Sequence, residues 1–262
     1  MTLIAIVMAT LAAGIGSVWL AALLGLAMLA RFTQHLLSLA AGALLATAFM
    51  HLLPEAFESQ AGAKELFATL LVGLVFFFLL DKAELWHHGH EHGHDHDHGH
   101  EHHGHAHHNP ERKSGGWAVL AGDSVHCFGD GILIASAFVA DLHLGLVAAL
   151  AVLAHEVPHH MGDLMVLRQT SGNRRAALIK VSLAGAVTAL GGLIGYFLVE
   201  KLHDFLPYFL VVASSSFIYV ALADLIPQLQ KHLSLRGTAA QIAWLLVGIA
   251  LVTVVSGVAH SH

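Results

Sequence analysis

The chain has 262 residues, of which 56% are hydrophobic and 11% charged, with a formal net charge of -6 at pH 7. Soluble domains usually carry about 25% charged residues, so this composition excludes an ordinary soluble domain and favours an integral membrane protein. The acidic balance and the scattered basic residues give no sign of a nucleic-acid partner. The single cysteine, Cys127, excludes an intrachain disulfide.

Apolar windows of about 20 residues predict eight membrane-spanning helices. In chain order we place them near 3–30, 35–57, 65–86, 115–140, 143–167, 176–200, 205–230 and 238–259. The predicted fold is therefore an all-α membrane protein with a 3+2+3 arrangement. Helices 1–3 occupy 1–86, helices 4–5 occupy 115–168 and carry the metal site, and helices 6–8 occupy 169–262.

The basic residues predict the orientation, because cytoplasmic loops are enriched in Lys and Arg. With the N-terminus outside, ten of the twelve basic residues fall on the inner side, and only Lys64 and Lys201 fall on the outer side. We therefore expect both termini to be extracytoplasmic. The short chain favours a plasma (inner) membrane location.

Spans 2 and 7 contain similar segments, Phe49–Glu55 and Leu222–Gln228. Each has an ionisable residue three positions before a proline, namely His51 before Pro54 and Asp224 before Pro227. The two helices are predicted to run in opposite directions. The similarity therefore suggests an inverted repeat that relates spans 1–3 to spans 6–8.

Residues 87–114 contain a histidine-rich segment in which histidine alternates with Gly, Asp, Glu and Ala. Such a segment has almost no apolar side chains to bury, so it predicts a disordered loop, which the topology places on the cytoplasmic side. Flexible imidazoles and carboxylates bind metals weakly but in number. We interpret the loop as a local metal buffer and consider an expression tag the weaker alternative.

Two polar clusters interrupt the apolar sequence of spans 4 and 5, at residues 126–131 (HCFGDG) and 155–163 (HEVPHHMGD). Ligand-type residues four positions apart lie on one side of a helix. The pairs with this spacing are His126/Asp130, His155/His159, Glu156/His160 and His159/Asp163. Because burying imidazole and carboxyl groups in a bilayer is expensive, we predict that the two helices face each other around a divalent cation.

The donor atoms of these clusters favour zinc. Histidine nitrogens, carboxylate oxygens and the sulfur of Cys127 suit borderline metals, although Fe²⁺, Mn²⁺, Co²⁺ and Cd²⁺ remain alternatives. Pro158 has no N–H to donate to the carbonyl of Ala154, and a membrane helix tolerates this loss where protein, water or an ion satisfies the carbonyl. We therefore expect backbone carbonyl groups to be available near the ion.

Three other interpretations remain open. His126 and Asp130 alone could form a buried hydrogen bond that holds two helices together. Residues 155–159 also read HExxH, the signature of a zinc metalloprotease in which Glu156 activates water. The internal proline and the surplus of ligands count against that enzyme. A cation-diffusion-facilitator exporter would fit the first cluster, but such exporters usually have six spans and a soluble C-terminal domain.

Further ionisable residues extend the candidate metal path. His51 and Glu55 lie one helical turn apart near the predicted outer end of span 2. They predict a metal entrance, whereas the alternative is an ordinary kinked helix end. His160 and Asp163 continue the cluster of span 5, and Asp224 could line the path from span 7.

The chain resembles the ZIP (Zrt/Irt-like) metal transporters, especially their LIV-1-like subfamily. Three motifs carry the resemblance: HLLPE at 51–55, the family pattern HNFxDG met at 126–131, and the pattern HExPHExGD met at 155–163. The eight spans, the outer termini and the histidine-rich loop after span 3 extend the resemblance over essentially the whole chain.

Two positions depart from the family pattern: Cys127 replaces an asparagine and His160 replaces a glutamate. The resemblance implies a main metal position and an adjacent one. The main position would take His126, Asp130, His155 and His159, whereas Cys127 and Glu156 would complete the adjacent one, with Asp130 and His159 as candidate bridges. Some relatives add an acidic ligand from span 6, where this chain has Ser182 and Thr188, so the resemblance implies a less acidic centre.

The resemblance also implies uptake of a divalent metal cation, most of all zinc as the substrate, into the cytoplasm, without enzymatic activity. One helix bundle would slide against a fixed one. The chain has no GxxxxGK[ST] motif, so the ion gradient and the membrane potential would drive transport. Protons compete with metal for imidazole, so transport could depend on pH. The expected partners are the cation and the lipid bilayer, with a homodimer left open.

Overall fold

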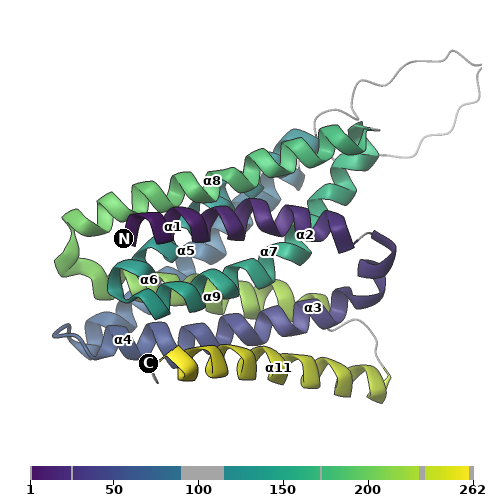
Figure 1. Cartoon of the computed structure of the whole chain (residues 1–262). Helices are drawn as coiled ribbons and strands as arrows, with labels where there is room; N and C mark the ends of the chain where they lie inside the picture. Colours follow the sequence, from purple (N-terminus) through teal and green to yellow (C-terminus); the bar gives the residue numbers. More distant parts are fainter. Residues whose placement is uncertain (1, 25, 90–114, 172, 230–233, 260–262) are drawn as a thin grey trace, which may run out of the picture.

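The computed structural model describes residues 2–24, 26–89, 115–171, 173–229 and 234–259, and the elements in this part of the chain are all helical (Figure 1). The α-helices are α1 (Thr2–Leu11), α2 (Ser17–Leu24), α3 (Leu26–Thr47), α4 (Leu53–Phe57), α5 (Ala63–Gly89), α6 (Gly115–Ala140), α7 (Leu142–Ser171), α8 (Arg174–Lys201), α9 (Leu206–Tyr219), α10 (Ile226–Leu229) and α11 (Leu235–Ala259). Short π-helical segments η1 (Ala12–Gly16), η2 (Ala48–Leu52) and η5 (Val220–Leu225) join some of them, and η4 (His203–Phe205) is a 3-10 turn.

Eight helical spans in the described residues are long and apolar enough to cross a membrane, which confirms the predicted all-α membrane fold. They are Thr2–Leu24, Phe32–Phe57, Ala63–Leu80, Leu120–Ala140, Leu142–Arg168, Arg174–Lys201, His203–Ala223 and Leu235–Val254. The predicted end of the first span at residue 30 is wrong, because α2 ends at Leu24 and α3 begins at Leu26. The apolar sequence continues across this boundary, so hydropathy alone does not detect it.

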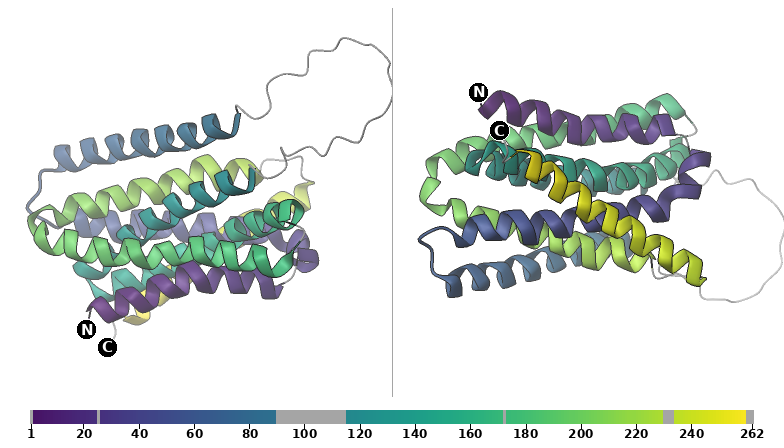
Figure 2. Two further views of the ribbon diagram at one scale, coloured as in Figure 1. Left: turned by 90° about the horizontal axis from the view of Figure 1, so that it is seen from above. Right: turned by 60° about the horizontal axis from the view of Figure 1, so that its bottom comes forward.

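The eight spans differ in how much of their surface other helices cover. In the span Phe32–Phe57, 67% of the most apolar window is buried, against 11% in the spans Ala63–Leu80 and Leu235–Val254. Figure 2 shows α5 at one edge of the bundle and α11 across its outer face. Their exposed leucines, valines and phenylalanines therefore form an apolar surface suited to lipid.

Helices α6 and α8 approach each other closely because glycines face the contact. A Cβ atom at Gly131 would overlap the carbonyl oxygen of Thr188, and one at Gly191 would overlap that of Phe128. Small residues of this kind let helix backbones pack directly in membranes. Residue 131 is the last of the first polar cluster, so this packing fixes the helix that carries half of the candidate site.

A one-residue connection joins α6 to α7. The carboxylate of Asp141 accepts hydrogen bonds from the backbone N–H groups of His143 (2.8 Å) and Leu144 (3.1 Å), which caps the start of α7. Because the connection is so short, the two helices are antiparallel neighbours. The predicted spans 4 and 5 thus lie side by side, which a shared metal site requires.

The segments that suggested an inverted repeat share a backbone feature. The π-helical segment η2 ends two residues before Pro54, and η5 ends two residues before Pro227. π-Helical turns inside α-helices often occur at functional sites. The matching placement agrees with an internal repeat, and the 3+2+3 repeat itself stays a prediction.

The histidine-rich loop falls mostly outside the described residues. Its first residues, 87–89, continue α5, and residues 90–114 are not described. Helix α1 begins and α11 ends at the same end of the bundle (Figure 1). This arrangement is the one expected for an even number of spans.

Candidate metal site

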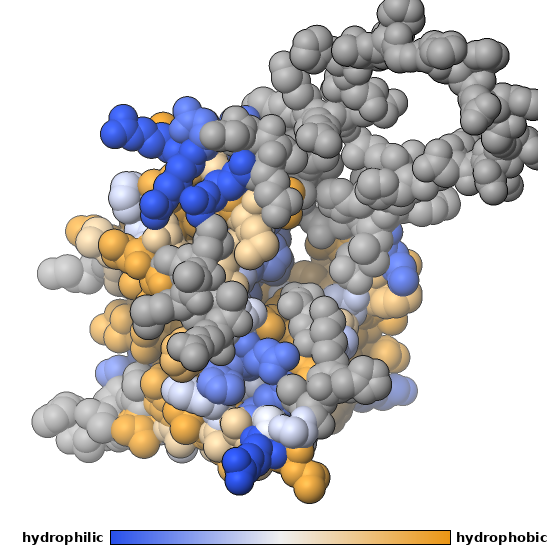
Figure 3. Space-filling model, turned by 90° about the vertical axis from the view of Figure 1, so that its right-hand side faces the viewer, coloured by the Kyte–Doolittle hydropathy of each residue, from blue (hydrophilic) through white to orange (hydrophobic). Residues whose placement is uncertain are grey.

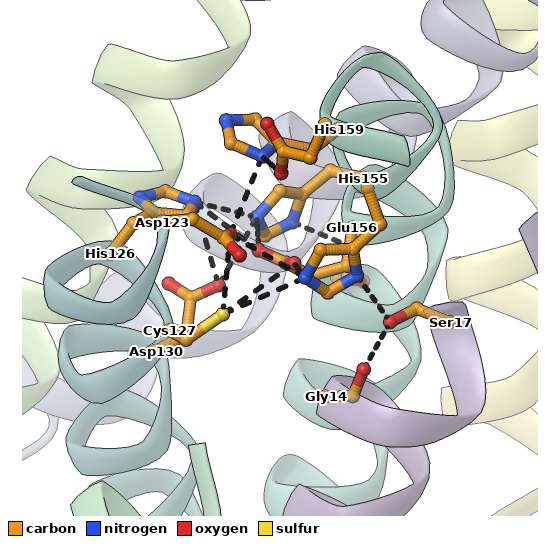
Figure 4. A network of polar contacts seen from close by, with 12 residues as sticks. Gly14, Ser17, Asp123, His126, Cys127, Asp130, His155, Glu156 and His159 are labelled. Carbon is orange, nitrogen blue, oxygen red and sulfur yellow. Dashed lines mark hydrogen bonds and ion pairs between the residues drawn. The ribbon is translucent and has the colours of Figure 1, made fainter. Parts of the chain in front are cut away.

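The polar faces of α6 and α7 meet inside the bundle (Figure 4). Helix α6 contributes Asp123, His126, Cys127 and Asp130, and α7 contributes His155, Glu156, His159, His160 and Asp163. Most of these side chains are inaccessible to solvent. Asp130, His155 and Glu156 are 2%, 2% and 1% exposed, and Cys127 and His160 are fully buried.

The first group of ligand atoms comes from His126, Asp130, His155 and Glu156, and these atoms lie within 4.8 Å of one another. Nε2 of His155 is 3.1 Å from Oδ2 of Asp130. Oε1 of Glu156 is 3.3 Å from Nε2 of His126 and 3.3 Å from Nε2 of His155. The group therefore contains two imidazole nitrogens and two carboxylates directed at one small volume.

The second group comes from Asp123, Cys127, Glu156 and His160, all buried. Nε2 of His160 is 3.0 Å from Oε2 of Glu156 and 3.5 Å from Oδ1 of Asp123. The sulfur of Cys127 lies 3.8 Å from the same nitrogen. Glu156 belongs to both groups and directs one oxygen to each.

A third group comprises Asp123, His159 and Asp163. Nδ1 of His159 is 3.5 Å from Oδ2 of Asp163 and 3.8 Å from Oδ1 of Asp123. The ring of His159 also stacks on that of His126, with 5.2 Å between centroids. The structure therefore groups His159 with two aspartates, whereas the family resemblance placed it in the main position. The residues shared between groups are Glu156 and Asp123, whereas the resemblance suggested Asp130 and His159.

Sequence reasoning missed Asp123. It lies four residues before Cys127 and seven before Asp130, a spacing that places all three on one face of α6. That spacing was a usable signal, but Asp123 lies outside the family motif. Asp123 is buried, and α6 therefore supplies a second carboxylate to the ligand groups beside Asp130.

Ser17 was also missed, because it comes from α2, 143 positions away in sequence from the residue that it contacts. Its hydroxyl donates to the carbonyl oxygen of Gly14 at 2.6 Å and lies 2.8 Å from Nδ1 of His160. Because this hydroxyl donates to Gly14, its oxygen is free to accept a hydrogen bond from Nδ1–H of His160. Nε2 of the same ring then points at Glu156 and Asp123, the orientation that a ring bound to a metal through Nε2 needs.

Four buried carboxylate oxygens lack a hydrogen bond of good geometry: Oδ2 of Asp123, Oδ2 of Asp130, Oε1 of Glu156 and Oδ2 of Asp163. The last three lie 3.1 to 3.5 Å from histidine nitrogens, so their contacts in the described residues are with other candidate ligands. Buried carboxylates are costly unless they are paired or bind a cation. Nitrogen, oxygen and sulfur donors together form a set suited to zinc and similar metals.

Helix α7 continues through Pro158 without interruption. The proline nitrogen still cannot donate to the carbonyl of Ala154. His155 and His159 belong to different ligand groups, although a zinc protease would need both on one ion. Glu156 contacts His126, His155 and His160, so it is placed as a shared ligand. In a zinc protease it would instead activate water, so this placement does not favour the protease interpretation.

The candidate entrance residues lie apart from the central groups. His51 and Glu55 line a cavity of about 330 Å³ together with Glu58, Asp141 and His143. This cavity lies where α4 meets the connection between α6 and α7. Asp224 belongs to η5, and its side chain lies outside the part of the chain that the structure describes.

The fold and the site together define a multi-span helical membrane protein with a buried cluster of metal-ligand side chains between two adjacent helices. The sequence model of the family described as "ZIP Zinc transporter" matches residues 81–256, which is more than half of the chain. The chain therefore belongs to the ZIP family. Members of this family are transporters and not enzymes, so membership disfavours both the metalloprotease and the cation-diffusion-facilitator exporter.

Curated relatives place the chain near the LIV-1 subfamily. Zinc transporter ZIP4 of Homo sapiens is 37% identical over 123 residues, which are 47% of this chain and 19% of that protein. Zinc transporter foi of Drosophila melanogaster is 34% identical over 141 residues, covering 53% and 20%. Zinc transporter ZIP10 of Homo sapiens is 34% identical over 113 residues, covering 43% and 14%. The aligned regions thus span a fifth or less of these relatives.

Proposed function

We propose that this protein carries divalent metal cations, above all zinc, across the membrane between α6 and α7. The observation that supports this most directly is the position of Glu156, which belongs to two adjacent groups of ligand atoms. A cation that moves from one group to the other keeps a carboxylate ligand throughout the step. Zinc is favoured by the donor set and by the zinc transporters among the relatives.

The ligand groups follow α7 along the direction of transport. From His155 to Asp163 the helix rises about 12 Å, and from His143 in the outer cavity to His155 about 18 Å, at 1.5 Å per residue. The sum, about 30 Å, matches the thickness of the hydrocarbon core of a bilayer. We propose His51 and Glu55 as the entrance, and His159, His160 and Asp163 as ligands on the path after the first group.

We infer that the direction is from outside to the cytoplasm, across the plasma (inner) membrane and with both termini outside. Each elementary charge that moves inward across 100 mV gains about 2.3 kcal/mol, so a divalent cation gains about 4.6 kcal/mol. The potential alone can therefore drive uptake. The basic residues concentrated on one side of the predicted topology support this orientation.

In this proposal Cys127 and His160 determine the metal selectivity of the site. A thiol and an imidazole replace the amide and carboxylate of the family pattern, and softer ligands favour zinc and cadmium over iron and manganese. Fe²⁺, Mn²⁺ and Co²⁺ are the weaker substrates. A homodimer is compatible with this assignment, because all the ligands in the three groups come from one chain.

Zinc flux into proteoliposomes that contain a zinc-sensitive dye tests the proposal. His155→Ala and Asp130→Ala should abolish flux while the protein stays folded. His203→Ala and Asp204→Ala are matched controls, because both residues are exposed in η4, and should leave flux unchanged. Normal flux in both site variants would contradict the assignment of these ligands.

Expression in cells tests the direction separately. An importer should raise the zinc content of cells in zinc-poor medium, whereas an exporter should lower it. A decrease in cell zinc would overturn the proposed direction but not the proposed site.

A further inference from the structure

A second cavity lies at the end of the bundle where α2 and α7 end and α8 begins. Its volume is about 340 Å³, and none of its lining residues belongs to the three ligand groups. One part of the lining is apolar and includes Trp19, Leu23 and Leu178. The other part is lined by three arginines, Arg168, Arg174 and Arg175.

Among the residues that the structure describes, the positive charge on the arginine side of this cavity has no acidic partner. None of the described lining residues is acidic, and no salt bridge within this part of the chain involves Arg168, Arg174 or Arg175. Arg174 and Arg175 lie in the first turn of α8, where the helix dipole adds to the positive potential. Guanidinium groups bind phosphate through two parallel hydrogen bonds, so three of them form a strong anion site.

The apolar side of the cavity faces the region expected for lipid. Trp19 is 51% exposed and Leu23 is 79% exposed, and both lie in the last two turns of the first span. Tryptophan is enriched at the boundary between hydrocarbon and water. Figure 3 views this end of the molecule and shows hydrophilic side chains gathered at the top, where α8 begins, beside apolar surface.

We propose that this cavity binds an anionic phospholipid, with the phosphate between the three arginines and an acyl chain along Trp19 and Leu23. A free phosphate ion would contact only the arginines, whereas a zwitterionic lipid also brings a cationic group that the three arginines repel. Basic cavities between membrane helices on the cytoplasmic side are suited to anionic headgroups, and the predicted orientation places this end in the cytoplasmic leaflet. The proposal depends on the membrane-spanning fold and not on metal transport.

Native mass spectrometry of the full chain in a neutral detergent tests this proposal. We expect selective retention of phosphatidylglycerol over phosphatidylcholine. The triple variant Arg168→Gln/Arg174→Gln/Arg175→Gln should lose about 100-fold in affinity, because each basic residue contributes about 1 kcal/mol near an anionic lipid and 1.4 kcal/mol is tenfold. The control Lys64→Gln/Lys201→Gln/Arg236→Gln removes three exposed cations elsewhere and should retain the lipid.

A second variant separates loss of binding from loss of fold. Arg175 is exposed, so Arg175→Glu should leave thermal unfolding in the absence of lipid unchanged and still weaken phosphatidylglycerol retention. Equal retention of both lipids, or equal loss in the control, would overturn the proposal. Stabilisation by inorganic phosphate alone would also overturn it, because that result would indicate a simple anion site. Lipid binding that occurs only after deletion of residues 90–114 would overturn it as well, because it would indicate that the histidine-rich loop occupies the cavity.

Discussion

The substitution Glu156→Gln should weaken cation binding at two positions simultaneously. Glutamine keeps the shape of the side chain but removes its negative charge. In the unchanged protein one carboxylate oxygen faces His126 and His155, and the other faces His160. A bond to a charged group contributes about 1.5 to 3 kcal/mol, so each position should lose about 10- to 150-fold in affinity. By contrast, Asp130→Asn should weaken only the first position, because Asp130 belongs to one group.

Calorimetric titration of metal-free protein with zinc in detergent distinguishes these outcomes. We expect two dissociation constants to rise in Glu156→Gln and one to rise in Asp130→Asn. Glu200→Gln is the matched control, since Glu200 is exposed at the end of α8, and its titration should match that of the unchanged protein. If Glu156→Gln raised only one constant, or none, with the protein still folded, the shared-ligand geometry would be refuted.

Three other substitutions test individual contacts. Ser17→Ala should lower zinc affinity about 10-fold or more in the same titration, since it removes the hydrogen bond that orients His160, and Ser17→Thr should restore it. Cys127→Ser should reduce the ability of cadmium to compete with zinc for uptake, because it removes the soft sulfur ligand; unchanged competition would show that the thiol does not contact the cation. Gly131→Ala should cost about 1 to 3 kcal/mol of stability in thermal unfolding because its methyl group overlaps α8, whereas Gly129→Ala, which meets nothing within 4 Å, should not destabilise the protein. Equal midpoints for the two alanine variants would contradict the close packing of α6 on α8.

The spans could be predicted because hydropathy is a local property of the sequence. Segments long enough to cross the hydrocarbon core exclude most charged residues, so eight of them are visible without a structure. The boundary between α2 and α3 could not be found in this way, because the apolar sequence continues from one helix into the next. The short connection at Asp141, by contrast, requires α6 and α7 to be adjacent.

Helical spacing predicts only part of the candidate site. Ligand-type residues four positions apart lie on one face of a helix, and this spacing identified His126, Asp130 and His155 as candidate ligands. It does not determine which side chains of one helix meet which side chains of the other. The grouping of His159 with Asp123, and the hydrogen bond from Ser17 in α2, arise from tertiary packing.

Anomalous diffraction at the zinc absorption edge, from crystals of the zinc-bound protein, tests the central claim most directly. We expect a zinc peak between α6 and α7, about 2.0 to 2.3 Å from nitrogen, oxygen or sulfur atoms of both helices. One oxygen of Glu156 should be among its ligands. Zinc bound only elsewhere in the molecule, with the side chains of the two helices free of it, would contradict the claim that they form a shared cation site.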